Sequence, residues 1–289
     1  MNEWTQAQIN YAAGMILRID SGERNVFRDS VNTEKQIEAK ILGEDQGVFF
    51  ACMFEGGLRV HIALATDTDE FNEEIAALVR GSLKKASTNT SEMWILNGNR
   101  KLIAYLKETF RLHDKRDYAS IEFIMRRENF HPEKNDTLEI RPYERKRLGK
   151  YLWLLDGSMT FSHPRANRRR LRIRLRRKKF DKDFAGMAKK DAFEAFWKDG
   201  ELVGLYWRKT HVPEVDTLAV ADKHQRKGYG AIILTRAIEV IFEHTDAPYA
   251  YLYAVDWNEK GQAFYKKYGM EENGHSYCLH IENYKGDTL

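Results

Sequence analysis

One segment in the last third of the chain constrains the fold most, because a strand pattern there passes through a short glycine-containing loop into an amphipathic helix. The strand pattern ends at Val220, glycines follow at positions 228 and 230, and a helical pattern continues from there. The first N–H groups of such a helix, from about Lys227 to Ala231, have no intrahelical acceptor and lie at the positive end of the helix dipole. The loop therefore predicts an anion site, most naturally for a pyrophosphate.

The loop residues themselves suit an anion. Gly228 and Gly230 let a phosphate approach the backbone without a Cβ in the way, and Arg226 and Lys227 add positive charge. The spacing lacks the third glycine of the dinucleotide fingerprint and the Gly-Lys-Ser/Thr of the P-loop, so neither of those nucleotide sites is predicted. A tight turn that binds nothing is the alternative explanation of the two glycines.

Two motifs in this part of the chain resemble the GNAT superfamily of N-acetyltransferases. The first fits that family's Q/R-x-x-G-x-G/A signature and reads Gln225-Arg226-Lys227-Gly228-Tyr229-Gly230, preceded on the strand by Leu218-Ala219-Val220. The second consists of Asn258, then Ala263-Phe264-Tyr265, then Tyr268-Gly269-Met270. The resemblance covers about residues 138–285, and it is specific because both motifs stand at the right separation in the right elements.

The resemblance implies a site for acetyl-CoA as a co-substrate. The pyrophosphate would bind the amides of residues 226–231, and the pantetheine arm would pair with the exposed strand edge at Leu218 and Val220 as an extra strand would. Asn258 would hold the far side of the arm, and the amide of Leu218 or Ala219 would polarise the thioester carbonyl. The implied cofactor-binding residues are Leu218, Ala219, Val220, Gln225, Arg226, Lys227, Gly228, Tyr229, Gly230, Ala231 and Asn258.

The implied reaction is direct attack of a primary amine on the thioester, which needs a base for the amine and an acid for the leaving thiolate. Tyr265 stands at the family position of the acid. Glu214 and Asp216 precede Leu218 at even spacing, so we expect all three on one strand face, with either carboxylate as the base. The family position favours Glu214, and a water relay is an alternative. Tyr265 as a core aromatic, and both carboxylates as solvated groups, are the competing interpretations.

The chain length of 289 residues is about twice that of a usual domain and indicates two domains. A polar, proline-containing stretch at 131–136 places the boundary near residue 132, which gives domains 1–131 and 132–289. The order of elements repeats, and Asn99 corresponds to Asn258. The predicted fold class is α/β (α+β), with two GNAT-like domains, each a mixed, centrally splayed β-sheet flanked by helices.

The first domain lacks the features of a cofactor site. Leu106 stands where the second domain has Tyr265, and a cluster of carboxylates, which would repel a pyrophosphate, takes the place of the glycine loop. Those carboxylates are Asp67, Asp69, Glu70, Glu73 and Glu74. We therefore expect a degenerate GNAT-like domain without cofactor. Apolar spacing further predicts a short helix over 35–42, and residues 276–281 are predicted as the last strand of the second domain.

The formal net charge of +4 comes from one segment, because Arg165–Lys179 contains ten basic residues and no acid. A helix starting near Ser162 and an edge strand both fit this run. It could be a solvated helix face, or it could attract an acidic acceptor, the outer phosphate of the cofactor, or nucleic acid. Nucleic acid is not favoured, because aromatic residues that stack on bases are missing from the run.

Several broad classes are excluded or disfavoured by composition. Two cysteines, Cys52 and Cys278, cannot form a disulfide framework and suit the cytoplasm. No apolar run reaches the roughly 20 residues that span a bilayer, so no membrane partner is expected. His275, Cys278 and His280 do not predict a metal site, because on a strand residue 275 points away from 278 and 280.

The function predicted from these residues is an acetyl-CoA-dependent N-acetyltransferase that acts on a small-molecule or peptide amine. A non-catalytic acyl-CoA-sensing protein, or an RNA- or ribosome-associated protein on the same fold, is the alternative. Neither the acceptor nor the oligomeric state follows from the sequence.

Overall fold

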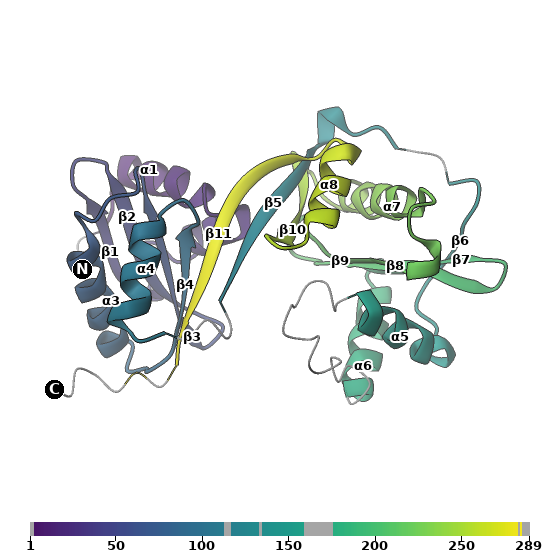
Figure 1. The fold of residues 1–289 in the computed structure, drawn as a ribbon, viewed down its shortest axis with the longest axis horizontal. Coiled ribbons are helices and arrows are strands. Elements are labelled where there is room, and N and C mark those ends of the chain that lie inside the picture. Colours follow the sequence, from purple (N-terminus) through teal and green to yellow (C-terminus); the bar gives the residue numbers. More distant parts are fainter. Residues whose placement is uncertain (1–2, 113–116, 133–134, 159–175, 283, 285–289) are drawn as a thin grey trace. The chain divides into compact units, whose positions relative to one another are not determined.

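The computed structural model describes residues 3–112, 117–132, 135–158, 176–282 and 284, and it contains two compact units (Figure 1). The first unit comprises residues 1–122 and 273–289, and the second comprises residues 123–272. This division differs from the predicted one, in which a single boundary lies near residue 132. The chain leaves the first unit at Glu122 and returns to it in β11 (Glu271–Ile281).

The returning strand β11 pairs with β4 (Ser91–Leu96) of the first unit, with Ser276 opposite Leu96 and Ile281 opposite Ser91. Sequence reasoning assigned this strand to the second domain because a strand normally joins the elements that precede it along the chain. Local pattern predicts the strand itself, but its partner depends on a long-range pairing that no local pattern specifies.

The first unit is a mixed sheet with helices on both faces. Its strand order is β1-β2-β3-β4-β11-β5, with β3 parallel to β4 and antiparallel ladders from β1 to β3. Helices α1 and α2 pack around Phe27 and Phe50 on one face, and α3 and α4 pack around Ile62 and Leu102 on the other. The remaining elements are α1 (Gln6–Leu17), α2 (Ser21–Arg28), β1 (Gln36–Leu42), β2 (Gly47–Phe54), β3 (Gly57–Leu64), α3 (Asn72–Lys85), α4 (Arg100–Thr109) and β5 (Tyr118–Arg126).

The short helix predicted over 35–42 is wrong, because these residues form the edge strand β1. Glutamine, glutamate, alanine, lysine and leucine are good helix formers, so local propensity favours a helix here. The strand instead pairs with β2 from Gln36 opposite Cys52 to Leu42 opposite Gly47, with a bulge after Gln36. Tertiary pairing therefore overrides a weak local preference.

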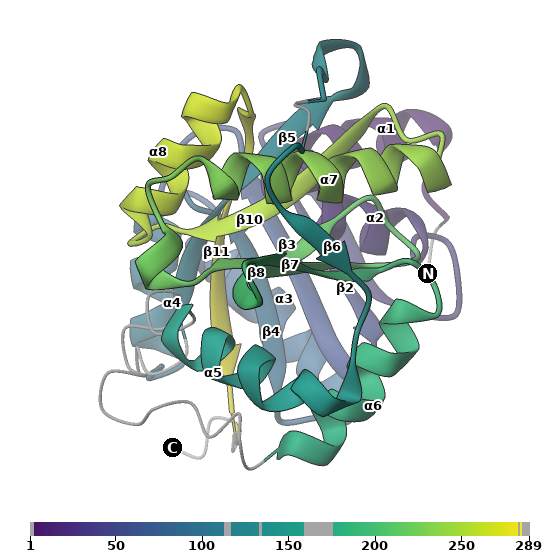
Figure 2. The same cartoon turned by 90° about the vertical axis from the view of Figure 1, so that its right-hand side faces the viewer.

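The second unit contains an antiparallel sheet in the order β6-β7-β8-β9. Helices α5 and α6 pack on one face through a cluster that includes Tyr151, Phe184 and Trp197. Figure 2 shows α7 and α8 on the other side of these strands. The elements are β6 (Glu139–Arg141), α5 (Leu148–Ser158), α6 (Arg177–Ala188), β7 (Phe193–Lys198), β8 (Glu201–Arg208), β9 (Val215–Val220), α7 (Tyr229–His244), β10 (Tyr249–Val255) and α8 (Glu259–Tyr268).

Asp199-Gly200 is a strong turn dipeptide, and a hairpin at these residues joins β7 to β8. Both turn residues have positive φ, 50° at Asp199 and 76° at Gly200, as a type I′ turn requires. Most of the arginine run, including the helix expected from Ser162, lies outside the described residues. Its last residues begin α6.

Close packing of α7 on the sheet leads to a stability prediction at Gly204 of β8. A Cβ at Gly204 would lie 2.5 Å from Ile233 Cδ1 and 2.6 Å from the Ala219 carbonyl oxygen. We expect Gly204→Ala to lower the free energy of unfolding by about 1–3 kcal/mol through overpacking. In the control Gly186→Ala, on α6, the new Cβ meets no heavy atom within 4 Å, so stability should hold or rise. Chemical denaturation measures both, and equal effects would contradict the packing argument.

Candidate active site

Strands β9 and β10 of the second unit touch at one end and then separate. Glu214 and Tyr251 form an isolated parallel bridge, and the Tyr251 amide donates to the Pro213 carbonyl at 2.9 Å. Beyond this bridge no ladder joins the two strands among the described residues, and they belong to different sheets. The edge of β9 that faces away from β8 is therefore left without a strand partner.

The predicted contacts at Leu218 and Val220 lie on this open edge. The Ala221 amide donates to the Val203 carbonyl of β8 at 2.9 Å. Because backbone groups alternate between the two edges of a strand, the groups of Leu218 and Val220 face away from β8. Gln225 Nε2 donates to the Val220 carbonyl at 3.1 Å, so that acceptor is already used. The remaining backbone groups are oriented as an added extended arm would need them.

The loop between β9 and α7 presents consecutive amides. Arg226 and Gly228 both adopt left-handed backbone conformations, with φ of 62° and 84°. The amides of residues 226–230 have no acceptor among the described residues, and such a run forms a concave anion site. The predicted set extends one residue too far, because the Ala231 amide donates to the Gly228 carbonyl at 3.0 Å and closes the first turn of α7.

The loop side chains have separate structural roles. Gln225 braces the turn through Val220 and also donates to Asp222 Oδ1 at 3.0 Å, whereas Arg226 and Lys227 are exposed. The Tyr229 ring is buried, and its hydroxyl accepts from Lys198 Nζ at 2.8 Å. Tyr229 can therefore contact a ligand in the loop through its amide, while its side chain anchors the β7–β8 hairpin.

Gly230 and Asn258 connect the loop to α8. A Cβ at Gly230 would lie 3.4 Å from the Phe264 ring, so this glycine allows α7 and α8 to pack closely. Asn258 caps α8, and its Oδ1 accepts from the Gly261 amide at 3.1 Å. The cap uses the oxygen of the Asn258 side chain and orients its NH2 group.

Tyr265, the predicted acid, lies on α8 with its ring packed between two other aromatic rings. The ring centroids of Phe123 and Phe264 lie 5.4 Å and 5.3 Å from that of Tyr265. Burial raises the pKa of Tyr265 to about 12. The phenol is thus fully protonated at neutral pH and able to donate.

The two candidate bases differ sharply in environment. The Glu214 side chain is buried, with Oε2 2.9 Å from Lys209 Nζ. Asp216 is exposed and accepts a hydrogen bond from Trp207 Nε1. The expectation that Glu214, Asp216 and Leu218 share one face fails, because Asp216 is an extra residue in the β8–β9 ladder: Trp207 pairs with Thr217 and Arg208 with Val215. Such a bulge interrupts the alternation on which the expectation rested.

Sequence reasoning missed Lys209, which bonds the buried Glu214 and lies 3.9 Å from Asp216 Oδ1. Lys209 follows β8 directly, and its amide donates to the Glu214 carbonyl at 3.0 Å. No spacing pattern predicts a lysine in this role, since its position depends on where the β8–β9 connection folds back.

In the first unit, strands β3 and β4 correspond to β9 and β10 of the second unit, but they stay paired. β3 and β4 pair from Leu58 opposite Ser91 to Ile62 opposite Ile95. Beyond that ladder, Asn99 closes the gap by accepting from the Leu64 amide at 2.9 Å and donating to its carbonyl at 3.3 Å. The central splay predicted for both domains is therefore seen only in the second unit.

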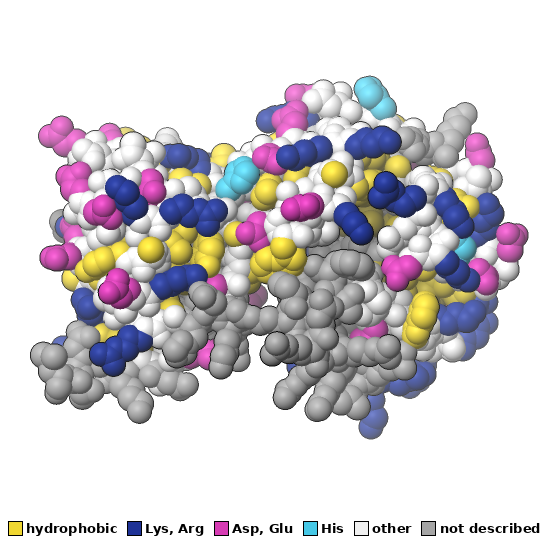
Figure 3. All heavy atoms as spheres, viewed as in Figure 1, with side chains coloured by type: hydrophobic (Ala, Val, Ile, Leu, Met, Phe, Trp, Pro, Cys, Tyr) yellow, Lys and Arg dark blue, Asp and Glu magenta, His cyan; other side chains and the backbone are white. Residues whose placement is uncertain are grey.

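Acidic groups in the first unit also take the place of the glycine loop. The Asp67 carboxylate accepts from the Lys101 amide at 2.9 Å, and Glu73 and Glu74 lie in the first turn of α3. Leu106 is fully buried in the core. Acidic and basic side chains are interspersed on the face of the first unit drawn in Figure 3, so this face carries no patch of one sign.

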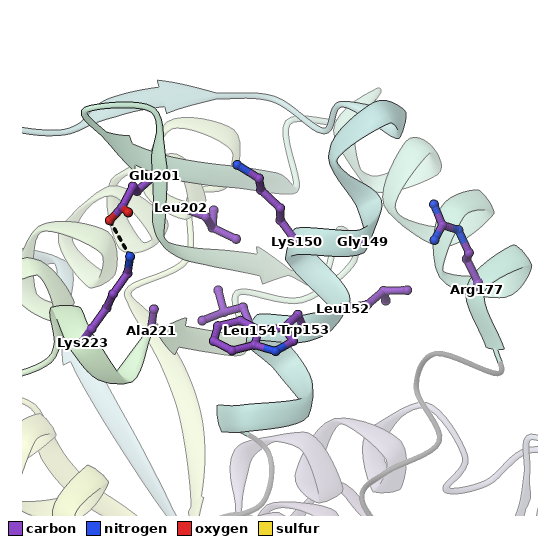
Figure 4. A pocket seen from close by; sticks show the side chains of 10 residues that line it. All are labelled: Gly149, Lys150, Leu152, Trp153, Leu154, Arg177, Glu201, Leu202, Ala221 and Lys223. Carbon is purple, nitrogen blue, oxygen red and sulfur yellow. Dashed lines mark hydrogen bonds and ion pairs between the residues drawn. The ribbon is translucent and has the colours of Figure 1, made fainter.

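The second unit also contains a cavity of about 570 Å³, which the sequence did not reveal (Figure 4). It lies between α5 and the adjoining ends of β8 and β9, with Leu154, Leu202 and Ala221 in its lining. Trp153 is 62% exposed there, and Lys223 is paired with Glu201 at 2.5 Å. Its lining includes neither Leu218 of the open edge nor the loop residues 226–230.

Metal ligands are not gathered at this site or elsewhere in the described part of the chain: no group of three or more His, Cys, Asp or Glu side chains is arranged to hold an ion. Cys278 and His280 share a face of β11, with Sγ 3.8 Å from Nε2. None of the helices within the described ranges has the length and apolar character needed to cross a bilayer.

The open strand pair and the amide-lined loop lie in an α/β unit, and their geometry is of the kind that suits a phosphorylated ligand at a helix N-terminus. Residues 172–270 match the model of the acetyltransferase (GNAT) family, so this part of the chain is similar to a GNAT acetyltransferase domain. The resemblance inferred from the two motifs is thereby confirmed.

A curated protein resembles this chain over a short span, and solved structures resemble its fold over nearly the whole chain. A mycothiol acetyltransferase from Acidimicrobium ferrooxidans is 31% identical over 80 residues, and the matched segment spans 25% of this chain and 26% of that protein. A GCN5-related N-acetyltransferase from Sphaerobacter thermophilus superposes with a TM-score of 0.55 at 13% identity, covering 100% of this chain and 96% of that one. A Drosophila protein superposes with a TM-score of 0.56 at 10% identity, covering 98% and 99%. These structures confirm the predicted fold class.

Proposed function

We propose that this protein is an N-acetyltransferase that transfers the acetyl group of acetyl-CoA to a primary amine. One observation carries the proposal: the unpaired edge of β9 leads directly into the run of unbonded amides at residues 226–230. An extended arm with amide groups and a pyrophosphate at one end would satisfy both features at once. Coenzyme A is such a molecule, and acetyl-CoA is the substrate of the GNAT family.

The chain's own residues divide the chemistry between them. The amide of Leu218 would donate to the thioester carbonyl as negative charge develops there. Glu214 would accept the proton of the attacking amine, directly or through water, because this residue bridges to Tyr251 at the point where β9 and β10 separate. Tyr265 would donate a proton to the departing sulfur. Asp216, which is exposed and bonded to Trp207, is the weaker candidate for the base.

The first unit is proposed to bind no coenzyme A. Its strands β3 and β4 are paired where β9 and β10 are open, and carboxylates occupy the corresponding helix start. The proposal for the whole chain is therefore one catalytic site in the second unit.

Binding and turnover can be tested separately on the full chain. Calorimetry with coenzyme A should show one site per chain, and thiol release from acetyl-CoA should depend on an added amine. The panel should contain an alkylamine, a polyamine, an amino sugar and a lysine peptide. Binding without amine-dependent thiol release would identify an acyl-CoA-binding protein instead, and absence of binding would reject the site.

Charge reversal at Arg226 and Lys227 tests the loop directly. Both side chains are exposed beside the free amides, so replacing both with glutamate should raise the coenzyme A Kd by about tenfold to a hundredfold. The effect should shrink at high salt, because exposed charges are screened. Lys182→Glu with Lys189→Glu, two exposed positions on α6 and directly after it, makes the same change in net charge and should leave Kd within about twofold. An equal loss in both double variants would show that net charge alone acts.

A further inference from the structure

Lys209 lies beside both candidate bases, a position that no pattern in the sequence predicts. Its Nζ lies 2.9 Å from Glu214 Oε2 and 3.9 Å from Asp216 Oδ1, so one ammonium group bridges both candidate bases. The Glu214 side chain is 7% exposed, whereas that of Lys209 is 40% exposed. A buried carboxylate is thus paired with a lysine whose head group stays accessible.

The backbone holds this pair at the entrance to the open strands. The Lys209 amide donates to the Glu214 carbonyl, and Glu214 is the residue that bridges to Tyr251 before β9 and β10 separate. Trp207 Nε1 donates to Asp216 and orients the second carboxylate. The ammonium group of Lys209 therefore lies at the carboxylate to which an acceptor amine would have to give its proton.

Two other lysines of this unit have different partners. Lys198 donates to the Tyr229 hydroxyl at 2.8 Å, and Lys223 pairs with Glu201 at 2.5 Å. Lys198 is the last residue of β7, beside the Asp199-Gly200 turn, and Lys223 lies in the connection that follows β9. Of the three, Lys209 alone is in contact with the proposed base, as a primary alkylamine substrate would be.

We propose that Lys209 is an internal acceptor, acetylated on Nζ by the active site of its own chain. This inference rests on the proposed function. In the step, the neutral amine attacks the thioester carbonyl of acetyl-CoA, a C–N bond forms and the C–S bond breaks. The ammonium first gives one proton to Glu214. The nitrogen loses its second proton as the amide forms, and this proton replaces the one that Tyr265 gives to the thiolate, so that coenzyme A leaves as a thiol and the tyrosine is restored.

Acetylation of Lys209 would also change the site. It removes the positive charge that Glu214 and Asp216 now share, and it leaves the buried Glu214 carboxylate without that partner. Self-modification would therefore alter the base on which transfer to external amines depends.

Mass spectrometry of the full chain after incubation with acetyl-CoA tests the proposal. Tryptic cleavage before Lys209 should yield the peptide 209–223 carrying one acetyl group, whereas Lys198 and Lys223 stay unmodified. The rate should be first order and independent of protein concentration. Glu214→Gln and Tyr265→Phe should each slow it by about tenfold or more. A heat-denatured sample measures the purely chemical reaction.

Three results would overturn the inference: no acetyl group on Lys209, equal labelling in the denatured sample, or a rate proportional to protein concentration. Failure of the proposed function looks different, because then no amine in the panel releases thiol from acetyl-CoA. Turnover of external amines with an unmodified Lys209 would reject only the internal acceptor. Lys209→Arg keeps the positive charge and should abolish labelling at 209 while the protein still binds coenzyme A.

Discussion

Replacing Tyr265 with phenylalanine should lower kcat by about a hundredfold or more while coenzyme A binding is retained. General acid catalysis by a positioned side chain contributes about 10²–10⁴ in rate, and the substitution removes only the hydroxyl. The ring keeps its contacts with Phe123 and Phe264, so the packing of α8 should survive. Steady-state kinetics with the best amine of the panel, together with calorimetry, measures both quantities.

The pH dependence of the wild-type enzyme follows from the same residue. Burial raises the pKa of Tyr265 to about 12, so the donating form is present at all lower pH values and is lost only as pH approaches that value. We therefore expect kcat to show no decline attributable to Tyr265 between about pH 7 and pH 10. A basic limb near pH 8 that disappears in Tyr265→Phe would contradict the raised pKa.

Tyr268→Phe is the matched control for Tyr265→Phe. Tyr268 lies on the same helix, and its hydroxyl hydrogen-bonds Thr235 Oγ1 at 2.7 Å. Its loss should cost about 1 kcal/mol of stability and leave kcat nearly unchanged. If Tyr265→Phe keeps full turnover, the acid is another group or water, and the ring serves only for packing.

The parts of the site that sequence predicts well depend on contiguous residues. The loop amides, the turn at Gly228 and the Tyr265 helix follow from motifs whose members are at most a dozen positions apart, because a strand–loop–helix unit is specified locally. The hairpin at Gly200 belongs to the same category. Local rules for turns and helix starts fix these geometries whatever the rest of the chain does.

The features that sequence missed all depend on pairings between distant segments. Residues 35–42 form a strand because β2 offers an edge, and β11 joins β4 although about 180 residues separate them. The bulge at Asp216 is a property of the ladder with β8, so even spacing along one strand could not reveal it. Lys209 meets Glu214 for the same reason. The sequence shows which residue stands at each of these positions, but it does not show the distant segment with which that residue pairs.

Gly228→Ala should weaken coenzyme A binding by about tenfold to a hundredfold. Compared with an alanine at another left-handed glycine, it distinguishes a loss of stability caused by backbone strain from a loss of the anion site. Gly228 has φ of 84°, where a residue with a Cβ costs about 1–2 kcal/mol, although no neighbour lies within 4 Å of the added carbon. Relief of that strain would rotate the amides on either side away from the phosphate, and each charged hydrogen bond is worth about 1.5–3 kcal/mol.

Gly200→Ala is the matched comparison, because Gly200 has φ of 76° and equally open surroundings at a turn of the same unit. Both variants should lose similar stability in thermal unfolding, since the backbone penalty is the same. Only Gly228→Ala should raise the coenzyme A Kd, because only that turn carries the amides at 226–230. If the two variants bind coenzyme A equally well, the left-handed turn at Gly228 is a structural requirement of the chain and the anion site lies elsewhere.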